Sequence, residues 1–166
     1  MVIRRLGTGD ERLLREVRLR ALEDAPYAFS SSLARESGLG PEFWEDRVAA
    51  SERGVDSVVV GAVETGQTLG MAGGFLLREE RGVAMVWGMW VAPSARRDGI
   101  GQKLLEAVAD WARDAGADHL QLAVTDCEES RPAAAFYRQL GFTQTGEQEP
   151  LDWNPSLIAR FLSRAL

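Results

Sequence analysis

Hydrophobic residues recur along the chain with two different spacings, and each spacing predicts a type of secondary structure. A repeat of three to four residues gathers apolar side chains on one side of a helix. It predicts helices over residues 9–25, 41–51 and 130–140 and over a segment that begins near residue 99. Pro26 ends the first helix, because proline has no amide hydrogen to donate. The polar segment that follows, residues 27–40, is expected to be a mobile connection.

Other stretches have the alternating or continuously apolar patterns of β-strands. The predicted strands cover residues 2–6, 57–64, 68–78, 82–93, 118–125, 141–146 and 157–163. The sequence Thr-Gly-Gln joins the second and third of these strands and predicts a hairpin. The stretch 82–93 is almost wholly apolar, as expected of a central strand that is covered on both faces. This order of helices and strands predicts an α+β fold with helices packed on a mixed sheet.

Length and composition restrict the class of protein. The 166 residues are enough for one domain with a sizeable core, so residues 1–166 are predicted to form a single domain. No apolar stretch is long enough to predict a membrane helix. The first residues lack the apolar segment of a signal peptide, so we expect a cytoplasmic protein. One cysteine and one histidine exclude an intramolecular disulfide and disfavour a zinc site.

The formal net charge of −6 disfavours non-specific binding to nucleic acid, which needs clustered cations. It is compatible with a cationic substrate, although acidic surfaces also simply keep proteins soluble.

A turn with adjacent arginines and two glycines carries the clearest chemical signal. It lies in "VAPSARRDGIGQKLLEAVADWA", residues 91–112, between a predicted strand and a predicted helix. Gly99 and Gly101 have no side chains to keep a ligand from the backbone, and amides at a helix N-terminus can donate to phosphate. Arg96 and Arg97 add positive charge. A plain strand-to-helix connection with solvated arginines remains the alternative at this point.

Two other phosphate-binding motifs fit this turn less well. A P-loop has Gly-Lys-Ser/Thr, but Gly101 is followed by Gln102. A dinucleotide-binding motif has a third glycine where this chain has Leu104. Neither motif therefore accounts for this turn.

Two segments resemble the GNAT (GCN5-related) N-acetyltransferases. The residues Arg-Arg-Asp-Gly-Ile-Gly at 96–101 match the Arg/Gln-x-x-Gly-x-Gly/Ala pattern of that family. "FYRQLGF", residues 136–142, matches a second family segment in the expected order and spacing. The resemblance spans nearly the whole chain and implies a mixed, mostly antiparallel central sheet with helices on both faces. It also implies that acetyl-CoA is the acetyl donor.

The resemblance assigns the cofactor contacts to three segments. The backbone of Met89, Trp90 and Val91 would pair with the pantetheine arm. Backbone amides of the turn would hold the pyrophosphate, and these belong to Arg96, Arg97, Asp98, Gly99, Ile100, Gly101 and Gln102. Tyr137 matches the family tyrosine that protonates the leaving thiolate, and an aromatic core residue is the alternative. Ser130 stands where many members have asparagine. Because serine has a shorter side chain, the resemblance does not decide whether Ser130 contacts the pantetheine.

No general base can be transferred from the family, because neither of the two strands that carry a glutamate in some members has one here. Acidic residues in two regions could accept the proton of the amine: Glu36, Glu42 and Glu45 in one, and Asp126, Glu128 and Glu129 in the other. We hypothesise that the acceptor amine docks between these regions. A proton transfer through water is equally consistent with the sequence, and each of these acids could instead be a solvated surface charge.

The resulting hypothesis is an N-acetyltransferase in which an amine attacks acetyl-CoA directly. The acceptor, a small molecule or a protein, is not identified. A non-catalytic acyl-CoA-binding sensor or structural module with the same fold is the main alternative, and a nucleotide-binding domain is a weaker one. A homodimer is possible through the last strand. Cys127 is expected to be a spare small residue, and Trp153 could either reach over the acceptor or cap the core.

Overall fold

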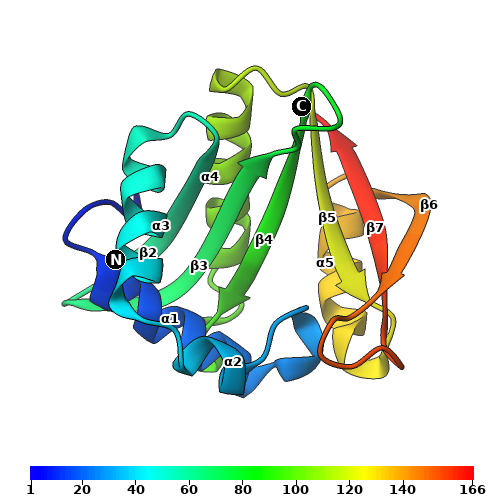
Figure 1. The fold of residues 1–166 in the computed structure, drawn as a ribbon. Coiled ribbons are helices and arrows are strands. Elements are labelled where there is room, and N and C mark those ends of the chain that lie inside the picture. Colours follow the sequence, from blue (N-terminus) through cyan, green and yellow to red (C-terminus); the bar gives the residue numbers. More distant parts are fainter.

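The computed structural model describes all 166 residues, and it contains a seven-stranded sheet with helices on both faces (Figure 1). The strands are β1 (Val2–Arg5), β2 (Ser57–Glu64), β3 (Gln67–Leu76), β4 (Val83–Val91), β5 (His119–Thr125), β6 (Thr143–Pro150) and β7 (Ile158–Ala165). The α-helices are α1 (Glu11–Asp24), α2 (Leu33–Ser37), α3 (Pro41–Arg53), α4 (Ile100–Asp114) and α5 (Arg131–Gln139). Three short 3₁₀ turns are η1 (Pro26–Ala28), η2 (Pro93–Ala95) and η3 (Glu128–Ser130). None of the helices combines the length and hydropathy that crossing a bilayer requires.

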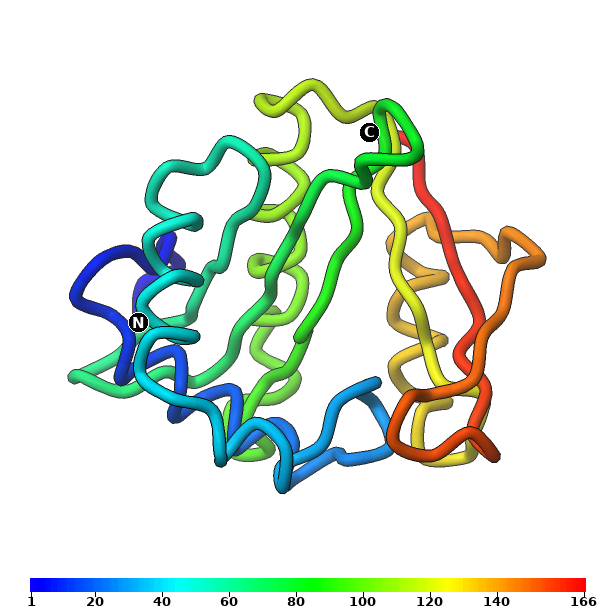
Figure 2. Tube along the Cα trace, in the orientation of Figure 1, coloured from blue at the N-terminus to red at the C-terminus, as the bar shows by residue number.

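The strands are arranged in the order β1-β2-β3-β4-β5-β7-β6, and only β4 and β5 are parallel neighbours. This confirms the expected mixed, mostly antiparallel sheet. The hairpin between β2 and β3 turns at Thr65 and Gly66, which both have positive φ angles, as a two-residue hairpin turn requires. The tube in Figure 2 shows β4 and β5 diverging from the end where they pair.

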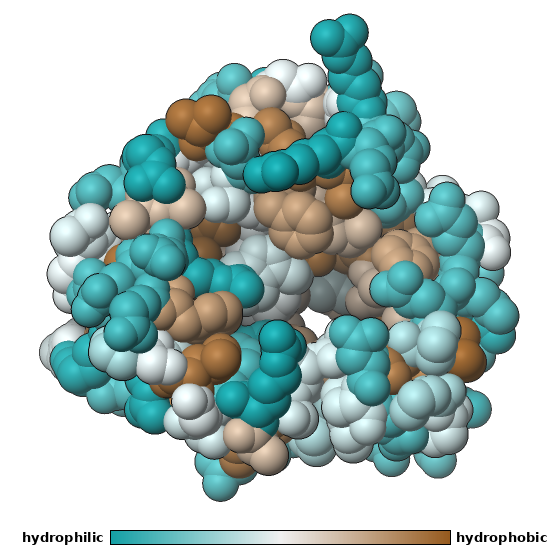
Figure 3. All heavy atoms as spheres, in the orientation of Figure 1, coloured by the Kyte–Doolittle hydropathy of each residue, from teal (hydrophilic) through white to brown (hydrophobic).

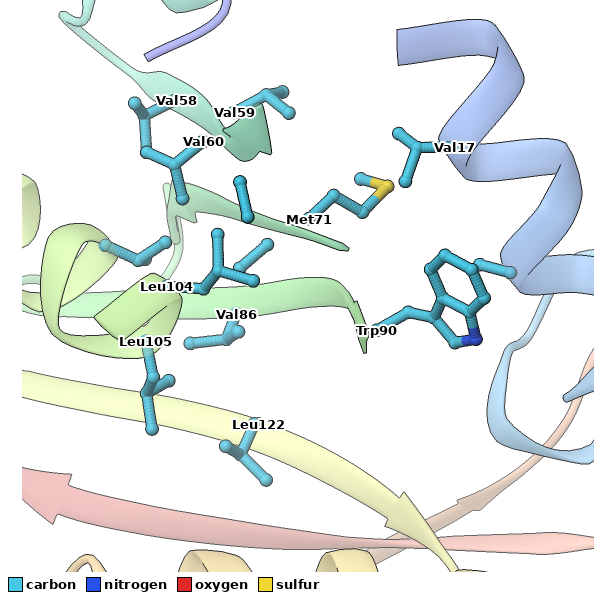
Figure 4. Packing of buried hydrophobic residues seen from close by; sticks show 14 of the residues in the cluster. Val17, Val58, Val59, Val60, Met71, Val86, Trp90, Leu104, Leu105 and Leu122 are labelled. Atoms are coloured by element: carbon cyan, nitrogen blue, oxygen red, sulfur yellow. The ribbon is translucent and has the colours of Figure 1, made fainter. Parts of the chain in front are cut away.

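Buried side chains on both faces of the sheet hold the helices in place. Val17 of α1 lies beside Met71 and Trp90 on one face, and Leu104 and Leu105 of α4 pack on the other (Figure 4). The face of α4 predicted from the repeat Ile100, Leu104, Val108 and Trp111 is buried in the structure. These contacts fix α4 behind β4, with its N-terminus beside the end of that strand.

Two expectations from the sequence need correction. Residues 27–40 are not a plain connection, because they contain α2 and part of η1. The Ser32 side chain caps α2 by accepting a hydrogen bond from the Arg35 amide, and Glu36 is buried against Arg18 of α1. The strand predicted at 82–93 is not covered evenly on both faces, because Trp87, Met89 and Val91 of β4 remain partly exposed. These three side chains lie where β4 and β5 separate.

Candidate functional site

A cleft opens through the sheet where β4 and β5 separate. The two strands pair only from Val83–Met85 to His119–Gln121, so the rest of β4 has no neighbour on that side. The cleft has a volume of about 370 Å³. Its walls come from α1, the segment before α2, β4, β5 and α5, and Asp152 adds a carboxylate at the rim. The space-filling view shows this opening between the two halves of the molecule (Figure 3).

A β-bulge at Gly88 sets the direction of the side chains along the free edge of β4. Trp87 pairs with Gly73 of β3 but Trp90 pairs with Met71, so β4 has one extra residue between them. Gly88 adopts a φ of 63°, which glycine reaches without strain. The bulge turns Trp90 toward α1, where its indole donates a hydrogen bond to Asp24 at 2.9 Å. Trp90 can therefore contribute its backbone to the cleft, but not its side chain.

The N-terminus of α4 offers a row of backbone amides without acceptors. The first amide of the helix that donates within the chain is that of Lys103, to the Gly99 carbonyl at 3.1 Å. The amides of residues 97–102 have no acceptor within the protein. Such amides, together with the positive end of the helix dipole, form a site for phosphate groups. The buried side chain of Ile100 holds the helix against the core while its amide remains free.

Gly101 is the point where the two sequence motifs and β4 meet. A Cβ atom at this position would lie 3.2 Å from Cε of Met89, 3.4 Å from Cζ of Phe136 and 3.7 Å from Cγ2 of Val91. These neighbours belong to β4 and α5, so any larger residue would displace side chains that line the approach from the turn to the cleft. The structure thus brings together Met89, Val91 and Gly101, as expected from the sequence.

The two arginines of the turn have different surroundings. Arg96 donates from Nε to the Val91 carbonyl at 2.9 Å and from Nη2 to Asp24 at 2.7 Å. Its guanidinium therefore braces the turn against β4 and α1. Arg97 has a φ of 72° and an exposed side chain with no partner in the protein. Arg97 is thus the arginine with its guanidinium free for phosphate, while the neighbouring Asp98, Gly99 and Gln102 are exposed.

Tyr137 and Ser130 line the cleft from the α5 side. Tyr137 is 7% exposed, and burial raises the pKa of its phenol. The hydroxyl therefore remains protonated across the neutral and mildly alkaline range and can donate a hydrogen bond into the cleft. Ser130 is buried and accepts a weak hydrogen bond from Cys127 Sγ at 3.3 Å. His119, at the opposite end of β5, is too distant to activate Cys127.

The acidic residues considered as proton acceptors differ in their burial and in their hydrogen-bond partners. Glu36 is neither a solvated charge nor a free base, because it is 5% exposed and accepts two hydrogen bonds from Arg18, each 2.9 Å long. Burial by itself raises the pKa of Glu36, but the hydrogen bonds and charge of Arg18 lower it overall. Asp126 lies outside the cleft and accepts from Arg160. The remaining four are exposed and do not line the cleft: Glu42 and Glu45 of α3, and Glu128 and Glu129 of η3.

The loop between β6 and β7 contributes Asp152, which the sequence analysis did not consider, and Trp153, which does not cap the core because it is exposed. Trp153 is 41% exposed, and its indole donates to the Phe29 carbonyl at 2.8 Å. The Asp152 amide donates to Ser30 Oγ at 3.2 Å. These bonds join the loop to the segment before α2 across one end of the cleft. Asp152 is the only carboxylate in the cleft lining. No sequence motif around Asp152 could have identified it.

Comparison with known proteins places the chain in a family. A family model described as "Acetyltransferase (GNAT) family" matches residues 17–142. The fold is similar to that of the PaiA N-acetyltransferase from Thermoplasma acidophilum in complex with coenzyme A. That match has a TM-score of 0.78 and 17% identity, and it covers 99% of this chain and 98% of the other.

Two curated relatives match shorter parts of the chain. Streptothricin acetyltransferase of Streptomyces lavendulae is 46% identical over 56 residues, which are 34% of this chain and 29% of that protein. IAA acetyltransferase of Azospirillum brasilense is 34% identical over 94 residues, which are 57% of this chain and 59% of that protein. The matched regions therefore span less than two thirds of the length of either relative.

Proposed function

Because the chain belongs to the acetyltransferase (GNAT) family, we propose that it transfers an acetyl group from acetyl-CoA to an amine that enters the β4–β5 cleft. The family membership confirms the resemblance found in the sequence. Acetyl-CoA is the acetyl donor of this family, which agrees with the expected class of cofactor.

The convergence at Gly101 supports this function most directly. The free amides of residues 97–102, the unpaired edge of β4 and the helix that carries Tyr137 meet there. A pyrophosphate on the amides would leave an extended arm to follow the free edge of β4 into the cleft, where an added strand can hydrogen-bond to the backbone. Glycine at 101 lets the start of α4 pack closely on Met89 and Phe136, which places the free amides beside the end of β4.

Each residue of the site has a definable role in the transfer. When bound, acetyl-CoA supplies an activated acetyl group as a thioester. The amine nitrogen forms a bond to the carbonyl carbon and the carbon–sulfur bond breaks. Tyr137 donates a hydrogen bond to the departing thiolate and passes its proton to the sulfur as negative charge develops there. Burial raises the pKa of the free phenol, so the hydroxyl is protonated at neutral pH. The proton of the amine leaves through water at the rim of the cleft, where Asp152 is the one available carboxylate.

Calorimetric titration with acetyl-CoA tests the cofactor site, with ATP and NAD as competing ligand classes. We expect acetyl-CoA to bind and Arg97→Gln to weaken binding by about 10-fold, the loss of one charged hydrogen-bonding partner. Arg113→Gln, at the other end of α4, is the matched control and should bind like the unmodified protein. If well-folded protein binds neither acetyl-CoA nor CoA, the proposal fails.

Steady-state release of CoA thiol with a panel of amines tests turnover. Thiol release that depends on the amine supports a transferase. Tight acetyl-CoA binding with no release for any amine would instead support the alternative, a non-catalytic acyl-CoA-binding module.

A further inference from the structure

Three arginines converge on the side of the cleft away from the α4 turn. Arg18 of α1, Arg35 of α2 and Arg47 of α3 line a second pocket of about 280 Å³, together with Trp87 of β4. Glu36 is the only carboxylate in that lining. This pocket shares Arg18, Arg35 and Trp87 with the cleft, so it extends the cleft on the side from which an acceptor can approach.

The single carboxylate of this pocket is already paired with one of the three arginines. Glu36 is held by Arg18 through Nε and Nη2. Arg18 is itself only 8% exposed, and its Nη1 has no hydrogen-bond partner. That nitrogen faces Gly88 at the cleft wall, 3.6 Å from where a Cβ atom of that glycine would lie. Arg18 thus keeps an unused donor at the junction of the two pockets.

The other two guanidinium groups have no carboxylate partner. Arg47 is stacked over the rings of Phe43 at 4.8 Å and Trp87 at 4.4 Å, which fixes its position. Burial lowers the pKa of Arg47, and the nearby charges of Arg18 and Arg35 lower it further against the opposing effect of Glu36. Arg35 is exposed, and no hydrogen bond or ion pair involves its side chain. The charges of Arg18 and Arg35 disfavour the charged form of Arg47, and a bound anion would offset this effect.

From this arrangement we infer that the acceptor is an amine that also carries a carboxylate, with the carboxylate bound by Arg47 and Arg35. A carboxylate accepts two parallel hydrogen bonds from a guanidinium, and it would supply the missing negative charge. Trp87 and Phe29 offer apolar surface for the body of the molecule. Asp152 attracts the amine at the other end of the cleft. This inference rests on the proposed function and names the substrate class for the same site.

The net charge of the whole chain would favour a cationic acceptor, so the inference depends on the local charges of the pocket. The protein has a formal net charge of −6, and on that basis a cationic acceptor was compatible with the sequence. Within a partly enclosed pocket the nearest charges dominate, because distant surface charges are screened by salt. Three arginines against one carboxylate therefore favour an anionic group locally.

Equilibrium binding of matched ligand pairs tests the inference independently of turnover. The probes are L-leucine against L-leucinol and L-phenylalanine against L-phenylalaninol, titrated into the full chain with saturating CoA. Each pair differs only in whether a carboxylate is present. We expect the amino acid to bind about 10-fold tighter or more in at least one pair, as a charged hydrogen bond predicts. In Arg47→Gln that preference should disappear, while Arg53→Gln on the same helix should retain it.

A second variant keeps the inference testable if Arg47→Gln does not fold. Arg35 is exposed, so Arg35→Gln can reduce the preference without threatening the core. Equal binding of acid and alcohol in both pairs, binding of neither ligand, or an unchanged preference in Arg47→Gln and Arg35→Gln would overturn the inference. Failure of the proposed function is a different result, namely no binding of acetyl-CoA or no thiol release with any amine.

Discussion

Replacing Glu36 with glutamine removes the only carboxylate from the pocket that Arg18, Arg35 and Arg47 share. The structure makes this a severe change, because Glu36 and Arg18 are 5% and 8% exposed and joined by two hydrogen bonds of 2.9 Å. The variant leaves the Arg18 charge buried and uncompensated, since the amide of glutamine can accept from it but carries no charge.

Breaking a buried ion pair by removing one partner costs about 3–5 kcal/mol. Glutamine retains one acceptor for Arg18, so we expect a loss of about 3 kcal/mol, near the lower end of that range. For a chain of this size the loss corresponds to a fall of about 6–12 °C in Tm. Urea unfolding followed by circular dichroism measures the free energy, and Glu45→Gln, an exposed glutamate on α3, is the control.

The pH dependence gives a second check on the same pair. Because the folded pKa of Glu36 lies below its ordinary value of 4.5, its contribution to stability is complete above that pH. The contribution is lost as the pH falls through the lowered folded pKa. Glu36→Gln should therefore lose less stability on acidification than the unmodified protein. A free energy of unfolding within about 1 kcal/mol of the unmodified protein would refute the reasoning, as would an unchanged acid dependence.

Three further changes test the other parts of the site. Tyr137→Phe should lower kcat by about 100-fold, because this is the usual contribution of a general acid, and should change the acetyl-CoA affinity little. Tyr27→Phe alters the only other tyrosine and should leave kcat unchanged. Gly101→Val should abolish acetyl-CoA binding by calorimetry while the protein remains folded, because the added side chain would push the start of α4 away from Met89 and Phe136. Binding at the original affinity would contradict the placement of the pyrophosphate proposed at this turn. Gly88→Ala should lower the free energy of unfolding by about 1 kcal/mol or more, because alanine would be forced to a positive φ and its Cβ would lie 3.0 Å from Cε of Met71. Urea unfolding measures this loss, and an unchanged free energy of unfolding would argue against the bulge.

The proposed cofactor half of the site rests on segments that the sequence alone brought into view. Met89, Val91 and the 96–102 turn are contiguous or nearly so in the chain, and local rules connect them: an apolar strand, a glycine-containing turn and a helix start. Tyr137 was assigned through a second local segment, and its role stays a prediction. The sequence did not distinguish Arg96 from Arg97, because the bond from Arg96 to Asp24 joins residues that are distant in the chain.

The proposed acceptor half could not be predicted in the same way. Arg18, Arg35 and Arg47 lie on three helices, and in the sequence each is one basic residue among many on an amphipathic or polar segment. Glu36 was expected to face solvent or to serve as a base, whereas tertiary packing buries it against Arg18. Asp152 and Trp153 belong to a loop with no recognisable motif, and only the fold brings that loop to the cleft.

The sequence by itself determined the order of the strands and of every α-helix except α2, the buried face of α4 and the open amides at its N-terminus. These features depend on periodicity and on residues close together in the chain, where local backbone preferences and hydrogen-bonding needs decide the outcome. The tertiary structure alone decided where β4 leaves β5, which arginine is free for phosphate, and that three arginines share one pocket. Those outcomes depend on contacts between distant segments, whose energies are settled only when the sheet and its helices pack together.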